Sequence, residues 1–228
     1  MFGAWEVGVW SVLREHVHVD MIVGASAGAW IGWLIACGAT PDELAREWQD
    51  PATAKLMQRG FHRWGWLLPD ALYEKARQLH ALGPPKIPFG LTLVEAPRMR
   101  VRLFRDGEIT WQHLAATASI PLSFPPVEIG GKWYVDGGAK GSLPVWAAEE
   151  MGATRAIAIN CLTLLPFRLV RAIVRPPRPS ADLRVTLIEP SRRLGSLKDG
   201  VIWKADNVKR WIEQGAEDAK RVLSSVRM

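Results

Sequence analysis

The sequence predicts a layered α/β/α fold around a central, largely parallel sheet. Predicted strands alternate with predicted helices along the chain, which is typical of this class. The 228 residues are enough for one sizeable domain, and 48% hydrophobic with 23% charged residues is an ordinary globular balance. The only cysteines, Cys37 and Cys161, exclude a disulfide scaffold, and the five histidines show no zinc-binding spacing. We therefore expect no metal and no cofactor.

The chain opens on a predicted helix. Trp5, Val9, Val12 and Leu13 recur at helical spacing, and the first ten residues contain no Lys or Arg. A secretory signal peptide needs a positively charged beginning, so we expect no signal peptide and a cytoplasmic location, with the membrane surface as a further possibility.

The uncharged run 21–41 allows two interpretations. It is long enough to be a single membrane span. Alternatively, it divides into a strand (19–23), a glycine turn (24–28) and a helix (29–37). Gly38 then ends this helix, and Thr40 caps the next one in a capping box with Glu43. Neither flank is clearly positive and the run is rich in Gly and Ala, so we favour the strand, turn and helix.

The remaining elements follow from periodicity and turn residues. We expect helices at 41–48, from about 70, at 111–118, 144–151 and 207–226, and strands at 89–94, 99–104, 127–129, 133–135, 155–159 and 184–188. Residues 64–68 include two tryptophans and two leucines, and a lid, an interface patch and core packing all remain open for them. An α/β domain fits this order.

A G-x-S-x-G pattern occupies the expected strand-to-helix turn: Gly24-Ala25-Ser26-Ala27-Gly28. A serine on such a sharp turn needs small neighbours because its backbone is strained and its surroundings are crowded. The N-terminus of the following helix adds positive potential where an oxyanion develops. Ser26 is therefore a candidate nucleophile.

A second motif, Asp136-Gly137-Gly138, follows a predicted strand. It fits either a β-turn or a carboxylate held out into a cleft. No histidine follows Asp136, so a Ser–Asp–His order of the α/β-hydrolase type is absent. His113 with Asp70 or Asp106 is a formal alternative. In a Ser–Asp dyad, the carboxylate itself takes the serine proton, which requires a raised pKa.

Four motifs in order resemble the patatin-like phospholipases, over roughly residues 3 to 160. They are the first helix from Gly3, the elbow at 24–29, the Pro-rich stretch 118–126 and the aspartate motif 136–138 followed by 143–145. The resemblance implies Ser26 as nucleophile, Asp136 as base, an acyl-serine intermediate and lipid acyl esters as substrates. Gly24 and Gly28 would shape the elbow, and Gly137 and Gly138 would hold the acid.

The chain departs from the family pattern at its start. The family begins with a strand and a Gly-rich loop that forms the oxyanion hole, and here only Gly3 matches its last glycine. We expect that Met1 is an internal methionine and that the first strand is missing. The Ala27 N–H remains as an oxyanion donor.

The positive charge is confined to the C-terminal part. Residues 1–163 carry 15 Lys/Arg against 16 Asp/Glu, and residues 164–228 carry 14 against 7. Arg168, Arg171 and Arg175 share one helical stripe, which fits an interfacial helix on anionic lipid or a solvated surface helix. There is no nucleic-acid-binding motif. We expect a catalytic domain at 1–160 and a basic extension at 161–228 that packs on it.

These observations favour a lipid acyl ester hydrolase that uses a Ser–Asp dyad. The alternatives are a catalytically impaired homologue or lipid-binding module without the oxyanion loop, and a single-span membrane protein.

Overall fold

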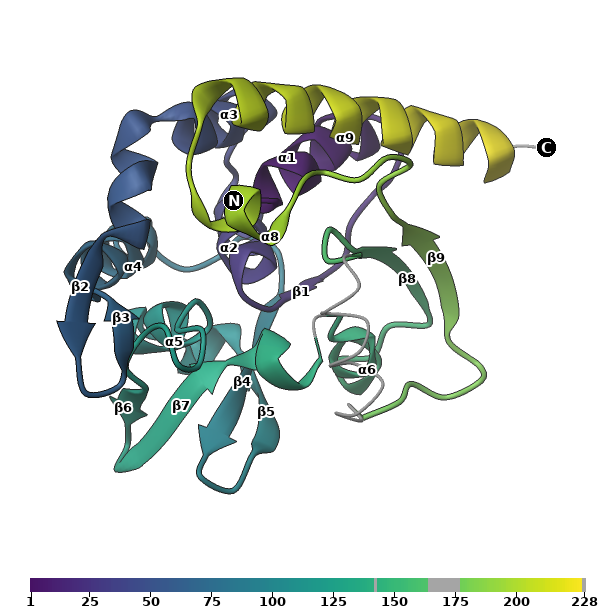
Figure 1. Cartoon of the computed structure of the whole chain (residues 1–228). Coiled ribbons are helices and arrows are strands. Elements are labelled where there is room, and N and C mark those ends of the chain that lie inside the picture. The colour runs from purple at the N-terminus through teal and green to yellow at the C-terminus, as the bar shows by residue number, and fades with distance from the viewer. Residues whose placement is uncertain (142, 164–176, 227–228) are drawn as a thin grey trace.

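The computed structural model describes residues 1–141, 143–163 and 177–226 (Figure 1). The stripe of Arg168, Arg171 and Arg175 lies outside these ranges. The α-helices are α1 (Gly3–Leu13), α2 (Ala27–Cys37), α3 (Pro41–Gln49), α4 (Asp70–His80), α5 (Trp111–Ala116), α6 (Val145–Glu150), α8 (Leu197–Val201) and α9 (Ala205–Val226). Short 3₁₀ helices are η1 (Pro51–Met57), η2 (Asp106–Glu108) and η3 (Gly137–Lys140).

A five-stranded sheet is built around the buried strand β4 (Phe89–Ala96). Its other strands are β1 (Ile22–Gly24), β5 (Arg100–Arg105), β6 (Val127–Ile129) and β7 (Lys132–Asp136). Strand β5 covers one edge of β4, so β1 and β7 share the other edge, one after the other. Helices flank this sheet, with α2 between it and the pair α1 and α9 (Figure 1). The layered α/β fold class is confirmed.

The strand directions are more mixed than we expected. Strand β1 runs parallel to β4, and a separate two-stranded sheet pairs β8 (Arg155–Ile159) with β9 (Arg184–Ile188) in parallel. The β4–β5, β4–β7 and β6–β7 pairs are antiparallel. Short connections explain two of them, because three residues join β4 to β5 and two join β6 to β7, and a parallel pair needs a crossover of a dozen residues or more.

The uncharged run 21–41 folds as a strand, a turn and a helix of 11 residues, α2. Gly38 ends α2 in the left-handed conformation (φ 99°), and Thr40 forms the expected capping box with Glu43 at the start of α3. Within the described residues, no helix has the length and apolar character needed to cross a membrane. The single-span interpretation of this run is therefore wrong.

Helix α9 packs closely along α1, and two glycines allow the approach. A Cβ on Gly8 would overlap the carbonyl of Ile212, and a Cβ on Gly215 would overlap the carbonyl of Trp5. Trp5 and Trp211 are fully buried in the core between the helices. Any larger residue at either glycine would push the two helices apart.

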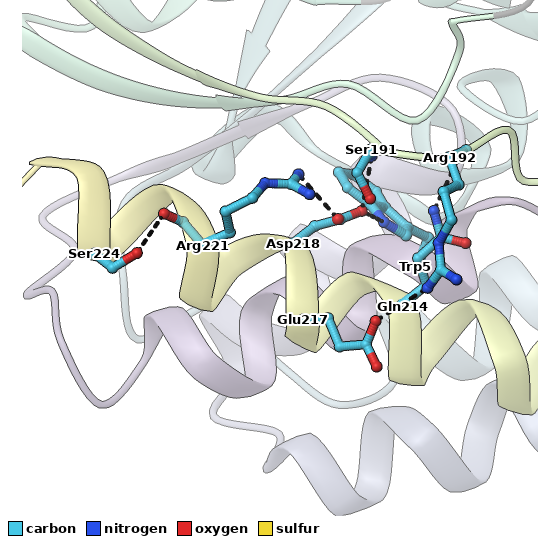
Figure 2. A network of polar contacts seen from close by, with 8 residues as sticks. All are labelled: Trp5, Ser191, Arg192, Gln214, Glu217, Asp218, Arg221 and Ser224. Atoms are coloured by element: carbon cyan, nitrogen blue, oxygen red, sulfur yellow. Dashed lines mark hydrogen bonds and ion pairs between the residues drawn. The ribbon is translucent and has the colours of Figure 1, made fainter.

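The carboxylate of Asp218 on α9 ties three segments together (Figure 2). It accepts hydrogen bonds from the Trp5 indole (2.9 Å) and the Ser191 backbone N–H (3.1 Å), and it forms an ion pair with Arg221 (3.0 Å). Burial alone would raise the pKa of Asp218, but the hydrogen bonds from Ser191 and Trp5 together with Arg221 lower it below its usual value. The chain after β9 is thereby fixed to both α1 and α9.

The hairpin of β2 (Arg59–His62) and β3 (Gly65–Leu67) was not expected from the sequence. Of the interpretations left open for residues 64–68, core packing describes only some of these residues, and others lie on the surface. Leu67 is buried in the main core, whereas Trp64 and Trp66 are 48% and 40% exposed. The stretch is therefore neither entirely core nor entirely surface.

Replacing Asp218 is expected to destabilise the fold strongly. Asp218→Ala leaves the Trp5 indole and the Ser191 N–H without their acceptor, at a cost of roughly 2–4 kcal/mol in the free energy of unfolding. Urea denaturation monitored by tryptophan fluorescence measures this loss. The control is Glu217→Ala, which removes an exposed ion pair with Arg192 and should cost less than about 0.5 kcal/mol. An equal loss in the free energy of unfolding in the two variants would contradict the conclusion that Asp218 holds the three segments together.

Candidate active site

The two sequence motifs meet because two strand ends meet on β4. Gly24, the last residue of β1, lies beside Leu91, and Asp136, the last residue of β7, lies beside Leu93. The two strands approach this point from opposite directions, so their C-terminal ends face each other across Thr92. Residues more than 100 positions apart in the chain are thus brought to one place on the sheet edge.

Ser26 occupies a strained turn between β1 and α2. Its backbone angles (φ 54°, ψ −134°) lie in a region that L-residues rarely adopt, and such strain costs on the order of 1–3 kcal/mol. A Cβ on Gly24 would lie 2.6 Å from atoms of Gly28 and Ala29, so only glycine allows α2 to start so close to the strand. This is the strand, tight turn and helix that a nucleophile elbow requires.

The Ser26 backbone is held from a third element. Its N–H donates to the Oγ1 of Thr117, at 2.9 Å, and Thr117 is fully buried at the end of α5. Ser26, Ala27 and Gly28 themselves are half-buried. The backbone of Ser26 is therefore held by α5, and the residue itself is not fully buried.

The Asp136 carboxylate faces Ser26 and is almost completely buried (5% exposed). Its Oδ1 accepts a hydrogen bond from the Gly138 N–H at 2.7 Å, and the Ser26 side chain lies close enough to the carboxylate to lower its pKa. Burial raises the pKa of Asp136 from 3.8 to about 6, although Ser26 and Gly138 lower it. A carboxyl group with this pKa can exchange a proton near neutral pH.

The two glycines after Asp136 are needed for different structural reasons. A Cβ on Gly137 would overlap the carbonyl of Thr92, so glycine lets the chain leave β7 directly against β4. Gly138 supplies the N–H that orients the carboxylate. The motif also begins the 3₁₀ helix η3, so the turn and the held carboxylate, which the sequence left as alternatives, occur together.

The start of α1 lies against the elbow. A Cβ on Gly3 would be 3.0 Å from the Cβ of Ala27, so these two expected site residues are neighbours. Ala27 and Gly28 begin α2, and the first N–H groups of a helix have no partner within it. The structure therefore places Gly3, Gly24, Ala27 and Gly28 around Ser26, beside a helix N-terminus.

Three site residues were missed by the sequence analysis. Thr117 and Thr92 are ordinary buried threonines by sequence, and nothing local marks them as neighbours of Ser26. Of the buried side-chain N and O atoms in the described ranges, only the Thr92 Oγ1 has no hydrogen-bond partner. Glu6 is a lone acid in an apolar helix, which was a usable signal; a Cβ on Gly28 would lie 3.4 Å from its Oε2. Burial raises the pKa of Glu6 to about 7, although the neighbouring Cys161 lowers it.

His113, the alternative base, is engaged elsewhere. Its Nδ1 accepts a hydrogen bond from the Thr110 N–H at 3.1 Å, and its ring packs against Phe104 on β5. Burial lowers the pKa of His113 to about 4. Of the two candidate bases, Asp136 is the one that lies beside the Ser26 side chain.

A family model, described as patatin-like phospholipase, matches residues 1–149. The chain belongs to the patatin-like phospholipase family. The matched residues include both Ser26 and Asp136 and end before β8. Among solved structures, this patatin-like chain is similar to VipD from Legionella pneumophila, with a TM-score of 0.56 and 10% sequence identity. The match covers 98% of this chain and 65% of VipD, and at this identity it supports the fold alone.

The raised pKa of Asp136 predicts a pH-dependent effect on stability. The unfolded chain releases this proton at a lower pH (3.8) than the folded chain (about 6), so the burial penalty is absent well below pH 4 and complete above pH 6. Asp136→Asn removes the penalty. We expect its gain in free energy of unfolding to be larger at pH 7.5 than at pH 4.5 by about 2 kcal/mol, measured by urea denaturation. The exposed Asp20→Asn is the control and should show no such trend.

Proposed function

We propose that this patatin-like chain is a lipid acyl ester hydrolase with Ser26 as nucleophile and Asp136 as general base. The observation that carries the proposal is the buried Asp136 carboxylate beside the Ser26 side chain, which a strained elbow presents. Strain of this kind is found where a reactive side chain must be presented in one orientation. The family name supports a lipid ester as the substrate class.

The proposed reaction has two halves. Ser26 Oγ attacks the ester carbonyl carbon while its proton passes to Asp136. The tetrahedral intermediate then breaks its bond to the leaving alcohol, which takes the proton from Asp136 and leaves an acyl group on Ser26. In the second half, water attacks the acyl group and gives its proton to Asp136. The fatty acid leaves as the proton returns to Ser26 Oγ.

The negative charge on the tetrahedral oxygen needs donors close to Ser26. We assign this role to backbone N–H groups at the start of α2, with Ala27 as the first. The helix N-terminus adds partial positive charge at the same place. Gly3 contributes by allowing α1 to lie against Ala27 without a side chain in between. One such donor typically contributes about 3 kcal/mol to transition-state stabilisation.

Activity and its pH dependence test this assignment. We expect hydrolysis of a p-nitrophenyl acyl ester to fall at least about 1000-fold in Ser26→Ala and in Asp136→Asn. In the wild type, kcat/KM should rise about tenfold between pH 5 and pH 7, because the carboxylate form of Asp136 becomes dominant above its pKa of about 6. Equal activity in the wild type and both variants would refute the dyad. Lipid binding without any hydrolysis would favour the lipid-binding module.

Thr117 is expected to act by positioning Ser26. Thr117→Val removes the acceptor of the Ser26 N–H, so the elbow is held less firmly and kcat should fall about tenfold with little change in KM. Thr117→Ser keeps the hydroxyl and should recover most of the activity. Thermal unfolding of both variants provides the control for general destabilisation. A fall in Thr117→Ser equal to that in Thr117→Val would show that packing, and not the hydrogen bond, is responsible.

A further inference from the structure

An exposed apolar surface lies beside the candidate active site, and we call it the aromatic hairpin surface. It is formed by the β2–β3 hairpin and by the segment after α5, which lie together at one side of the molecule (Figure 1). Its members are Phe61, Trp64, Trp66, Ile120 and Leu122. Phe61 is 97% exposed and Leu122 is 85% exposed. Large exposed apolar side chains on adjoining segments mark a binding site more often than isolated exposed residues do.

The two parts of the surface are joined by backbone contacts. The N–H groups of Trp66 and Leu67 both donate to the carbonyl of Ser123, at 3.2 and 3.0 Å. A Cβ on Gly65 would overlap that same carbonyl, so glycine permits the contact. The hairpin and the loop therefore present their apolar side chains as one unit.

Leu122 is exposed in an unfavourable way. Its backbone has φ 65°, the left-handed conformation that a leucine rarely adopts. The strained backbone and the exposure of the apolar side chain to water both destabilise the isolated chain. Both are understandable if Leu122 is buried by a partner.

The charges around the surface select the kind of partner. Residues 51–69 contain Lys55, Arg59 and Arg63 but no acidic residue, and residues 109–127 contain no Asp, Glu, Lys or Arg at all. The Arg63 guanidinium lies over the Trp64 ring at 4.6 Å, and that of Arg59 lies 6.0 Å from the Trp66 ring. Exposed aromatic rings alternating with arginines match the boundary between acyl chains and anionic headgroups.

We propose that the aromatic hairpin surface binds the anionic phospholipid bilayer, with Phe61, Trp64 and Leu122 inserted among the acyl chains and Arg59 and Arg63 among the headgroups. None of its residues belongs to the sequence stripe of Arg168, Arg171 and Arg175. Its use in catalysis rests on the proposed function, because a bound bilayer would present its esters to Ser26.

The segment 117–123 connects this surface to the dyad. Thr117 accepts from the Ser26 N–H, the Ser119 carbonyl accepts from the Asp136 N–H at 3.0 Å, and the Ser123 carbonyl holds the hairpin. Seven consecutive residues therefore contact both catalytic candidates and the proposed membrane surface. A bilayer on Leu122 would lie against the same segment that positions Ser26 and Asp136.

Vesicle co-sedimentation of the full chain tests binding without any turnover. The protein carries Ser26→Ala, so a failure of the proposed hydrolysis does not affect the result. We expect binding to phosphatidylcholine vesicles with about one third phosphatidylglycerol, and much weaker binding to phosphatidylcholine alone. Phe61→Ser with Trp64→Ser should lower the partition coefficient at least about tenfold. Arg59→Gln with Arg63→Gln should lower it roughly 25-fold on the anionic vesicles only.

Matched changes elsewhere provide the controls. Leu82→Ser removes another exposed leucine, and Arg192→Gln removes an exposed arginine beside α9, and both should bind vesicles like the parent. Thermal unfolding confirms that each variant is folded. Equal vesicle binding by the parent and both hairpin variants would overturn the proposal, as would the absence of binding by the parent. A parent that dimerises through the hairpin in gel filtration, without hairpin-dependent vesicle binding, would also overturn it.

Discussion

The meeting of β1 and β7 along one edge of β4 is the constraint on which the candidate site depends. Gly24 and Asp136 lie beside Leu91 and Leu93, so a register shift of two residues in either pairing would move a motif by about 7 Å and separate Ser26 from Asp136. The buried faces of β4 resist such a shift because its side chains fill the main core. Gly137 then lets the chain turn against Thr92 without a gap. The geometry of the proposed dyad is thus set by the packing of a strand that contributes neither of its two side chains.

The site lowers the stability of the fold, and the helical layer compensates for it. The strained Ser26 backbone and the buried Asp136 carboxyl each destabilise the folded state by on the order of 1–3 kcal/mol. The α1–α9 pair stabilises the folded state. It buries two tryptophans, its glycines allow close contact between the helices, and the Asp218 carboxylate accepts a hydrogen bond from the Trp5 indole. The N-terminal end of α1 adjoins the elbow at Gly3, so the stabilising layer is in contact with the destabilised site. A strained conformation such as that of Ser26 persists only where the surrounding structure holds it in place.

The sequence predicted the features that depend on nearby residues. Gly38 ends α2 and Thr40 caps α3 as expected, because helix capping depends on a few adjacent residues. Strands β8 and β9 also have the expected bounds, because the residue pattern of a strand is local. Ser26 and Asp136 were predicted as site residues from local motifs in the same way, and their catalytic roles stay predictions. The sequence could not show that Thr117 would reach Ser26 across 91 residues, because a buried threonine has no distinguishing pattern. The β2–β3 hairpin was also missed, since its aromatic side chains point to solvent and therefore break the expected periodicity.

The buried carboxyl of Asp136 gives the proposed membrane surface a chemical consequence. An anionic bilayer has a surface potential of about −30 mV, which concentrates protons and lowers the local pH by about half a unit. A base with a pKa of about 6 is then partly protonated at a bulk pH where it would be charged in free solution. The α2 N-terminus acts in the opposite direction, because its positive potential favours the oxyanion of the proposed tetrahedral intermediate whatever the bulk pH. Arg59 and Arg63 also reduce the negative potential beside the site when they bind the headgroups. The same basic side chains that would attract the bilayer would therefore help to keep Asp136 ionised on it.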